Sequence, residues 1–136
     1  MPAPRSLRDV HAALADEHRR LMALVSLLES EHDIARLAPM LRALHDLLVE
    51  HFAHEQFPGG LYEQLGAYGS QHHAELRELI HEHCSVLSAA RALVEHAERP
   101  QGGTRLLDDL ARLLAALRAH EIKEHRLVRK LQGDAA

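Results

Sequence analysis

Apolar residues recur every three or four positions along most of this chain, a spacing that predicts amphipathic helices. The apolar stripes indicate four long helices at about 6–31, 36–57, 70–98 and 104–131. No stretch alternates apolar and polar residues with a period of two, so no sheet is expected. Short connections make neighbouring helices antiparallel. The pattern therefore favours an all-α fold, an up-down-up-down antiparallel four-helix bundle formed by residues 1–136 as a single domain.

Helix-breaking residues separate the expected helices. Pro58-Gly59-Gly60 ends the second helix, and Pro100-Gln101-Gly102-Gly103 separates the third from the fourth. Ser6 is a candidate N-cap for the first helix. Residues 58–70 are the least regular part of the chain, with room for one or two helical turns that would include Tyr62. The breaks leave little of the chain outside helices.

The amino-acid composition limits the classes of partner and the cellular compartment that we expect for this protein. Hydrophobic residues make up 46% of the chain but aromatic residues only 3%, which suits helices packed through Leu, Ala and Val. A net charge of −4 without long blocks of one sign argues against a nucleic-acid partner. No run has the roughly 20 apolar residues of a membrane span. The first residues lack the apolar core of a signal peptide. We expect a cytoplasmic protein without a membrane partner, in which the single cysteine, Cys84, is reduced and buried.

Histidine carries the strongest chemical signal. There are 13 His residues, which points to metal or proton chemistry. His51 and Glu55 form a His-x-x-x-Glu pair in the second expected helix, and His120 and Glu124 form another in the fourth. Residues four apart lie on one face of a helix, with Cβ atoms about 5–6 Å apart. Both pairs continue the core-facing leucine stripe, where ionisable groups are costly unless they are paired or bound to metal. The pairs therefore predict a buried metal site.

Antiparallel pairing adds ligands from the other two helices. A connection at residues 30–39 places His18 opposite His51. On the third helix, His83 lies on the apolar stripe near the level of the site, so it is preferred to His73, which is displaced along the helix, and to His81, which points off the stripe. The candidate metal ligands are then His18, His51, Glu55, His83, His120 and Glu124.

This set contains more ligands than one tetrahedral zinc ion needs. Four imidazoles and two carboxylates suit two metal ions about 3.5–4 Å apart. In that arrangement Glu55 and Glu124 bridge the ions, two His bind each ion, and one position stays open beside an oxide or hydroxide bridge. Mixed imidazole and carboxylate ligands with a vacant position favour iron or manganese. Two iron ions are the expected cofactor, ahead of manganese or zinc.

At these residues the chain resembles the hemerythrin-like family, in its His-His-Glu (HHE cation-binding) branch. The likeness covers nearly the whole length and is carried by Asp16-Glu17-His18-Arg19, by the run from His51 to Glu55, by His83 and by His120 to Glu124. Ferritin-like bundles use Glu-x-x-His pairs instead. Oxygen-carrying hemerythrins have a His-x-x-x-His pair on the third helix and an Asp ligand on the fourth, whereas here no third-helix His has another His four residues away and the fourth helix offers Glu124. The chain looks more like the relatives that repair iron centres, sense iron or oxygen, or handle nitric oxide or peroxide.

The resemblance implies a non-haem di-iron protein, oxo- or hydroxo-bridged, that binds or senses O2, NO or peroxide at an open iron position. This reading favours a binding module over an enzyme. One alternative is a di-iron redox enzyme, either a peroxidase or an iron-centre repair factor. A second alternative is a metal-free helical bundle that binds a partner. Tyr62 would either hydrogen-bond a bound ligand or be a half-exposed loop residue. Whether the bundle forms a homodimer is left open.

Overall fold

All regular elements in the described part of the chain are helices. The computed structural model describes residues 6–99 and 103–134, and within these residues there is no strand, which confirms the all-α prediction for that part of the chain. The elements are α1 (Leu7–Ala13), α2 (Ala15–Ser30), α3 (Ile34–Gln56), α4 (Leu61–Gly66), the 3-10 turn η1 (Ser70–His72), α5 (His73–Ala97) and α6 (Gly103–Asp134). Of the expected turn at 100–103, residues 100–102 lie outside the described residues, and α6 begins at Gly103.

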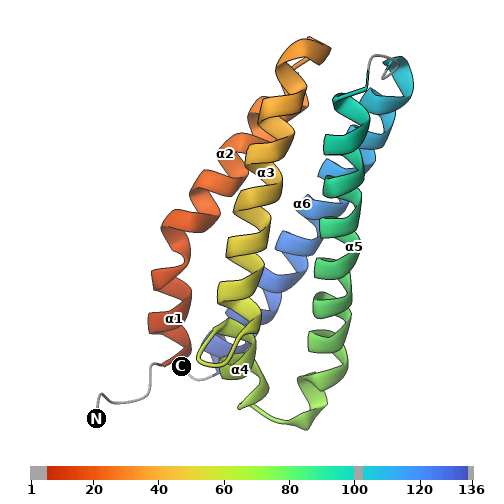
Figure 1. Cartoon of the computed structure of the whole chain (residues 1–136). Helices are drawn as coiled ribbons and strands as arrows, with labels where there is room; N and C mark the ends of the chain where they lie inside the picture. The colour runs from red at the N-terminus through yellow and green to blue at the C-terminus, as the bar shows by residue number, and fades with distance from the viewer. Residues whose placement is uncertain (1–5, 100–102, 135–136) are drawn as a thin grey trace.

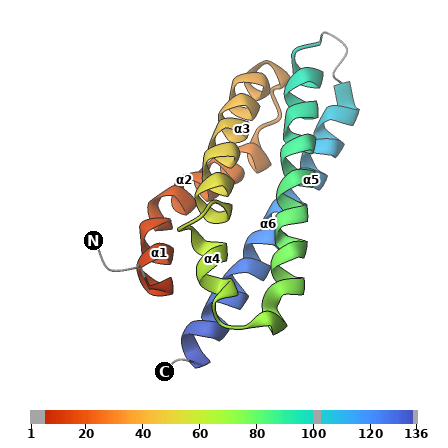
Figure 2. The ribbon, with the colours of Figure 1, turned by 60° about the horizontal axis from the view of Figure 1, so that its bottom comes forward.

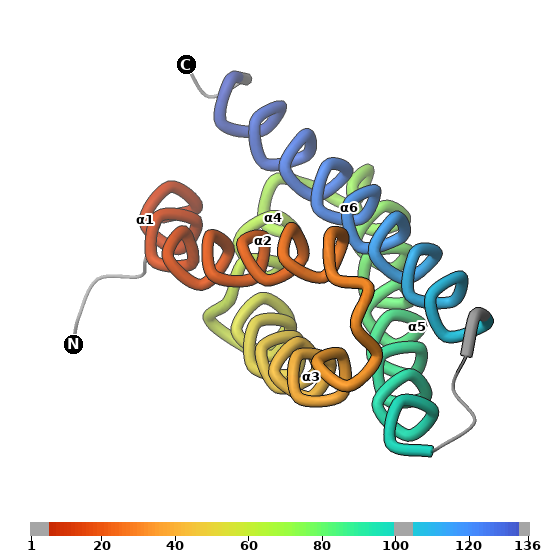
Figure 3. Tube along the Cα trace, turned by 90° about the horizontal axis from the view of Figure 1, so that it is seen from above, coloured from red at the N-terminus to blue at the C-terminus, as the bar shows by residue number. Residues whose placement is uncertain are grey.

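The four long helices lie alongside one another and form a helical bundle (Figure 1). α3 packs against α2 and α5, while α6 packs against α5 and α2. Seen from above, α2 runs between α3 and α6 (Figure 3). The short helices α1 and α4 contact each other at one end of the bundle, where α4 also contacts α3 and α5 (Figure 2). Among the described helices, none has both the length and the apolar character needed to cross a membrane.

The apolar interior is divided into two clusters. The main cluster fills the bundle along one part of its length and contains Leu21, Val25, Leu28, Leu37, Leu41, Leu44, Leu48, Phe52, Val86, Ala90, Leu93, Leu106, Leu110, Leu113, Leu114 and Leu117. The end cluster surrounds α1 and α4 and contains Leu7, Val10, Leu14, Leu61, Tyr62, Leu65, Leu76, Leu79, Leu127, Val128 and Leu131. Along α6 the main cluster ends at Leu117 and the end cluster begins at Leu127, so a band of other residues separates them.

The first expected helix is interrupted at Leu14. α1 ends at Ala13 and α2 begins at Ala15, although the sequence pattern predicts one helix over 6–31. Leu14 has φ −88° and ψ −5°, and no Gly or Pro marks the break. Its side chain is buried in the end cluster, and α1 packs against α4. The interruption therefore follows from packing against a distant segment, while the predicted cap is present, with Ser6 Oγ accepting from the Asp9 amide at 3.1 Å.

The turn after α3 depends on two glycines. Gly59 has φ 85°, a conformation that side-chain-bearing residues rarely adopt. A Cβ atom on Gly60 would lie 2.3 Å from the carbonyl oxygen of His54, so only glycine fits there. This tight turn brings α4, and with it Tyr62, back against the interior.

Leu44 in α3 offers a test of the main cluster. Its side chain has no exposed area, so Leu44→Ala is expected to lower the free energy of unfolding by about 2–5 kcal/mol. Leu27→Ala on α2, where the side chain is 60% exposed, is the matched control and should change it by less than about 0.5 kcal/mol. Urea unfolding in the presence of a chelator measures both. Equal effects of the two substitutions would contradict this packing.

Candidate metal centre

Six buried ionisable side chains meet in the band between the two apolar clusters. They are His51 and Glu55 from α3, His83 from α5, and His120, Glu121 and Glu124 from α6. Each is 5% exposed or less. Burying so many ionisable groups is costly unless they are paired, hydrogen-bonded or bound to metal. The ionisable groups of this band therefore need pairing, hydrogen bonds or a bound metal to offset the cost of their burial.

The ligand atoms of these side chains form two overlapping groups, within each of which they lie within 4.8 Å of one another. One group is His51, Glu55, Glu121 and Glu124, and the other is Glu55, His83, His120 and Glu124. Two carboxylates, Glu55 and Glu124, belong to both groups. Each group could hold a metal ion, and the shared carboxylates lie where they would link the two.

Glu55 shows this sharing most directly. Its Oε2 is 3.2 Å from His51 Nε2, and its Oε1 is 3.2 Å from His83 Nε2. His120 Nε2 lies 3.6 Å from Glu124 Oε2. Ligands held about 2.0–2.2 Å from one ion lie roughly 3–4 Å from each other. The measured separations therefore match the distances between side-chain atoms that bind the same metal ion.

The three histidines of this band, His51, His83 and His120, each have a hydrogen-bond partner at Nδ1, on the side of the ring away from the interior. Each Nδ1 lies within hydrogen-bond distance of a side-chain oxygen, so a proton on Nδ1 would leave Nε2 with a lone pair directed to the interior. The acceptors are Glu17 Oε1 for His51 at 2.8 Å, Gln56 Oε1 for His83 at 3.0 Å and Glu82 Oε1 for His120 at 2.8 Å. A histidine oriented by an outer carboxylate or carbonyl in this way is typical of metal ligands.

Atoms facing the interior lack hydrogen-bond partners. Within the described residues, the buried side-chain atoms without a partner include His51 Nε2, Glu55 Oε1, His120 Nε2 and Glu121 Oε1, all in this band. A buried polar group left unpaired costs about 1–3 kcal/mol. Each of these four residues belongs to at least one of the two ligand groups, so cations bound in both groups would satisfy all four atoms. The residues present therefore fit a metal centre.

In the metal-free protein the pKa values of Glu55 and Glu124, the two carboxylates common to both ligand groups, move in opposite directions. Burial raises the pKa of Glu55 well above its usual range, and the charge of Glu124 raises it further. Burial also opposes the charge of Glu124, but the neighbouring Glu55 and His120, together with the hydroxyl of Tyr62, lower the pKa of Glu124 to about 2. Burial, together with His120, lowers the pKa of His83 to about 3. His83 is therefore neutral at physiological pH, as a metal ligand must be.

Tyr62 is buried beside the centre, which corrects the reading of it as a half-exposed loop residue. Its hydroxyl donates to Glu124 Oε2 at 2.7 Å and lies 2.8 Å from His83 Nε2. Burial and the charge of Glu124 raise the pKa of Tyr62, so the hydroxyl keeps its proton. Phe52 stacks on His83 with ring centroids 3.7 Å apart. These two rings fix the plane of the His83 imidazole.

The structure distinguishes among the three histidines considered as metal ligands on the third long helix. His83 lies in the centre, whereas His73 and His81 are exposed on the outside of α5. Cys84 is exposed too, so the expectation that it is buried is wrong, because it lies on the turn of α5 that faces away from the core. Cys84 therefore contributes nothing to the centre.

His18 takes a different position from the other predicted ligands. Its Nε2 lies 2.9 Å from Glu121 Oε2, and its side chain is 41% exposed. It is not a member of either ligand group. The contact with Glu121 raises the pKa of His18. Glu121, which the sequence reasoning missed, stands between His18 and the interior.

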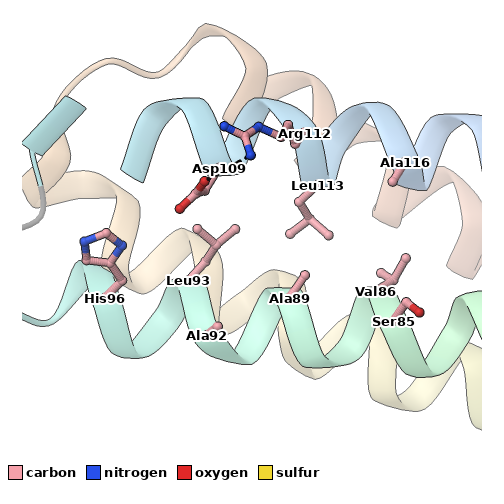
Figure 4. Close-up of a pocket in the computed structure, with 10 residues that line it drawn as sticks. All are labelled: Ser85, Val86, Ala89, Ala92, Leu93, His96, Asp109, Arg112, Leu113 and Ala116. Carbon is pink, nitrogen blue, oxygen red and sulfur yellow. Dashed lines mark ion pairs between the residues drawn. The ribbon is translucent and has the colours of Figure 1, made fainter. Parts of the chain in front are cut away.

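A separate cavity lies between α5 and α6 (Figure 4). It has a volume of about 450 Å³, with an apolar floor that includes Leu93 and Leu113 and an ion pair between Asp109 and Arg112 at its edge. The small side chains of Ala89 and Ala116 leave this space between the helices. None of the six buried ionisable residues lines it, so it is not part of the candidate metal centre.

Comparison of the chain with models of protein families, with curated proteins and with solved structures finds no match. The resemblance to the hemerythrin-like family therefore stays a prediction, which depends on the residues themselves and on the way they converge.

Proposed function

We propose that this protein is a di-iron module of the hemerythrin-like kind, an up-down four-helix bundle that binds or senses O2, NO or peroxide. The observation that carries the proposal is Glu55, whose two oxygens each lie 3.2 Å from a different inward-facing imidazole nitrogen. A carboxylate placed between two histidines in this way suits a bridge between two ions. Metal-free pairing explains it less well, because Glu55 Oε1 and His51 Nε2 lack hydrogen-bond partners.

The two ligand groups suggest which residues would hold each ion. His51, Glu55, Glu121 and Glu124 would form the first position, and Glu55, His83, His120 and Glu124 the second. In this proposal Glu121 takes the place that the sequence analysis gave to His18. Imidazole and carboxylate ligands together favour iron or manganese over zinc. We name iron because the proposed ligands are small molecules that bind to, or react with, reduced iron.

The surrounding residues supply the environment for such a centre. The main cluster and the end cluster limit the access of water from both sides. Tyr62 keeps a hydroxyl donor at the edge of the second position. When bound, iron would supply an open coordination position and a change of oxidation state. The protein contributes orientation, a low-dielectric interior and a hydrogen-bond donor.

Anaerobic reconstitution with ferrous iron tests this proposal. We expect about two iron ions per chain after removal of free metal, and a visible charge-transfer absorption of a bridged di-iron centre after exposure to O2. Addition of NO to the ferrous protein should give a different visible spectrum. Fewer than one iron per chain without such absorption would reject the proposal. Turnover of hydrogen peroxide by the iron-loaded protein would instead support the peroxidase alternative.

Substitution of Glu17 tests whether the hydrogen bond that orients His51 contributes to metal binding. Its carboxylate accepts from the Nδ1 atoms of His51 and His54, each at 2.8 Å. Glu17→Ala should weaken metal binding by about 10–100-fold while leaving the number of sites unchanged, because the His51 ring loses its orienting acceptor. Titration with Co²⁺ against a competing chelator measures the affinity. The exposed carboxylate Asp46 provides the control, and an equal loss in Asp46→Ala would contradict a specific role for Glu17.

A further inference from the structure

A second cavity connects the metal centre with the surface beside α1 and α2. Its volume is about 230 Å³, and His51, Glu55 and Glu124 line its inner part. Its outer part is lined by three histidines that the proposed centre does not use, His11, His18 and His125. Arg19 also lies at this cavity, but its charge is paired with that of Asp16. The cavity therefore joins a histidine-rich opening to a carboxylate-rich interior.

Glu121 stands between these two parts. It is only 5% exposed, and its Oε1 has no hydrogen-bond partner and lies 3.9 Å from His51 Nε2. Its other oxygen, Oε2, lies 2.9 Å from His18 Nε2 on the solvent side. One buried carboxylate thus contacts both an inner ligand and an outer histidine. A small movement of this side chain would carry a bound cation from one to the other.

The outer histidines come from both sides of the opening. The rings of His11 on α1 and His125 on α6 have centroids 5.9 Å apart, and the ring of His18 lies 6.0 Å from that of His51. Imidazole nitrogen is a good ligand for ferrous iron, cobalt and zinc but a poor one for magnesium and calcium. Together with the negative charge of Glu121, this opening favours divalent transition metals over the more abundant hard cations.

We propose that His11, His18, His125 and Glu121 form a loading site, a route along which one or two of these side chains at a time bind a divalent transition-metal ion before Glu121 passes it to the buried centre. The inference rests on the proposed function, because it assumes that the centre binds metal. It assigns a role to three histidines that lie outside both ligand groups. Carboxylates at the inner end of a low-dielectric cavity attract cations and raise the rate at which they enter.

The test compares the rate of metal uptake with the amount of metal bound. Stopped-flow mixing of the metal-free protein with Co²⁺ follows uptake by the visible absorption of bound cobalt. The double variant His11→Ala/His125→Ala should take up Co²⁺ at least about tenfold more slowly. Its final stoichiometry should equal that of the original chain, because neither residue belongs to the proposed ligand groups. The variant His11→Gln/His125→Gln, which keeps side-chain bulk, should show the same slowing, and circular dichroism confirms that both variants fold.

His73→Ala/His81→Ala is the matched control, because these two histidines are exposed on α5, away from the cavity. It should load at the original rate. Unchanged uptake in the His11/His125 variants with full stoichiometry would overturn the loading site and leave the proposed function standing. Equal slowing in the control would also overturn it. Failure of the original chain to bind Co²⁺ at all would overturn both proposals.

Discussion

Saturation of the protein with ferrous iron under anaerobic conditions is expected to raise its melting temperature by about 8–14 °C. A ligand that binds only the folded chain, at a free concentration 100 times its dissociation constant, stabilises by about 2.7 kcal/mol. For a chain of 136 residues, each kcal/mol corresponds to roughly 3–5 °C. The stabilisation arises because the bound ions satisfy buried atoms of His51, Glu55, His120 and Glu121 that otherwise lack partners. Calorimetry with and without iron measures the shift.

The control for this shift removes one imidazole from each ligand group. In His51→Ala/His120→Ala, the melting temperature should no longer depend on iron, and chelator should have no effect. A shift of the same size in that variant would indicate binding elsewhere on the chain. A melting temperature that iron and chelator leave unchanged in the original protein would favour the metal-free bundle, whose buried His and Glu only pair with each other.

Replacement of Glu55 is expected to remove both ions. Because its two oxygens face different imidazoles, Glu55→Gln should lower bound iron from about two per chain to well below one. Glutamine has nearly the same shape but cannot supply a charged bridge. The metal-free variant should be at least as stable as the original metal-free chain, since a buried carboxyl group that is costly to ionise is replaced by a neutral amide. Metal analysis after desalting, combined with urea unfolding, separates loss of iron from loss of fold.

His83→Ala provides the contrast. His83 belongs to one ligand group only, so this variant should keep about one ion per chain. If Glu55→Gln and His83→Ala retained the same amount of metal, the carboxylate would not be shared between two ions. The two variants therefore distinguish a di-metal centre from a single site.

The long helices follow closely from the sequence. The expected 36–57 and the observed Ile34–Gln56 differ by one or two residues, because a leucine stripe and a Pro-Gly-Gly sequence define that helix. The break at Leu14 could not be predicted, because it depends on packing against α4, which is distant in the sequence. Local pattern fixes where a helix can form, whereas contacts between distant segments decide where it bends.

The candidate centre was predicted only in part, because some of its residues follow from local pattern and others depend on contacts between distant segments. The pairs His51–Glu55 and His120–Glu124 are local in sequence, and their position on the stripe was enough to place them inside. Glu121 follows Leu117 by four residues and also fits the stripe, so a wider reading of the helix face would have found it. His18 and Glu17 both fit between Leu14 and Leu21, and only the packing of α2 against α3 places Glu17 inside.

The outer acceptors behind the histidines were beyond sequence reasoning. Gln56 and Glu82 look like ordinary surface residues of amphipathic helices. Their role depends on the contact between α3 and α5 and on that between α5 and α6, which bring them to His83 and His120. Such pairings require the angle and height at which two helices meet, and no local pattern gives these.

The division of the interior into a main cluster and an end cluster has a consequence for communication within the molecule. The side chains that would hold the ions form the layer between these two hydrophobic regions. Because Tyr62 of α4 donates to Glu124 and α4 packs against α1, we expect the packing of these two helices to depend on whether that layer holds metal. A change of ligand deep inside the protein would thus alter how firmly these two short helices are anchored, and that difference is one a partner at the surface could detect.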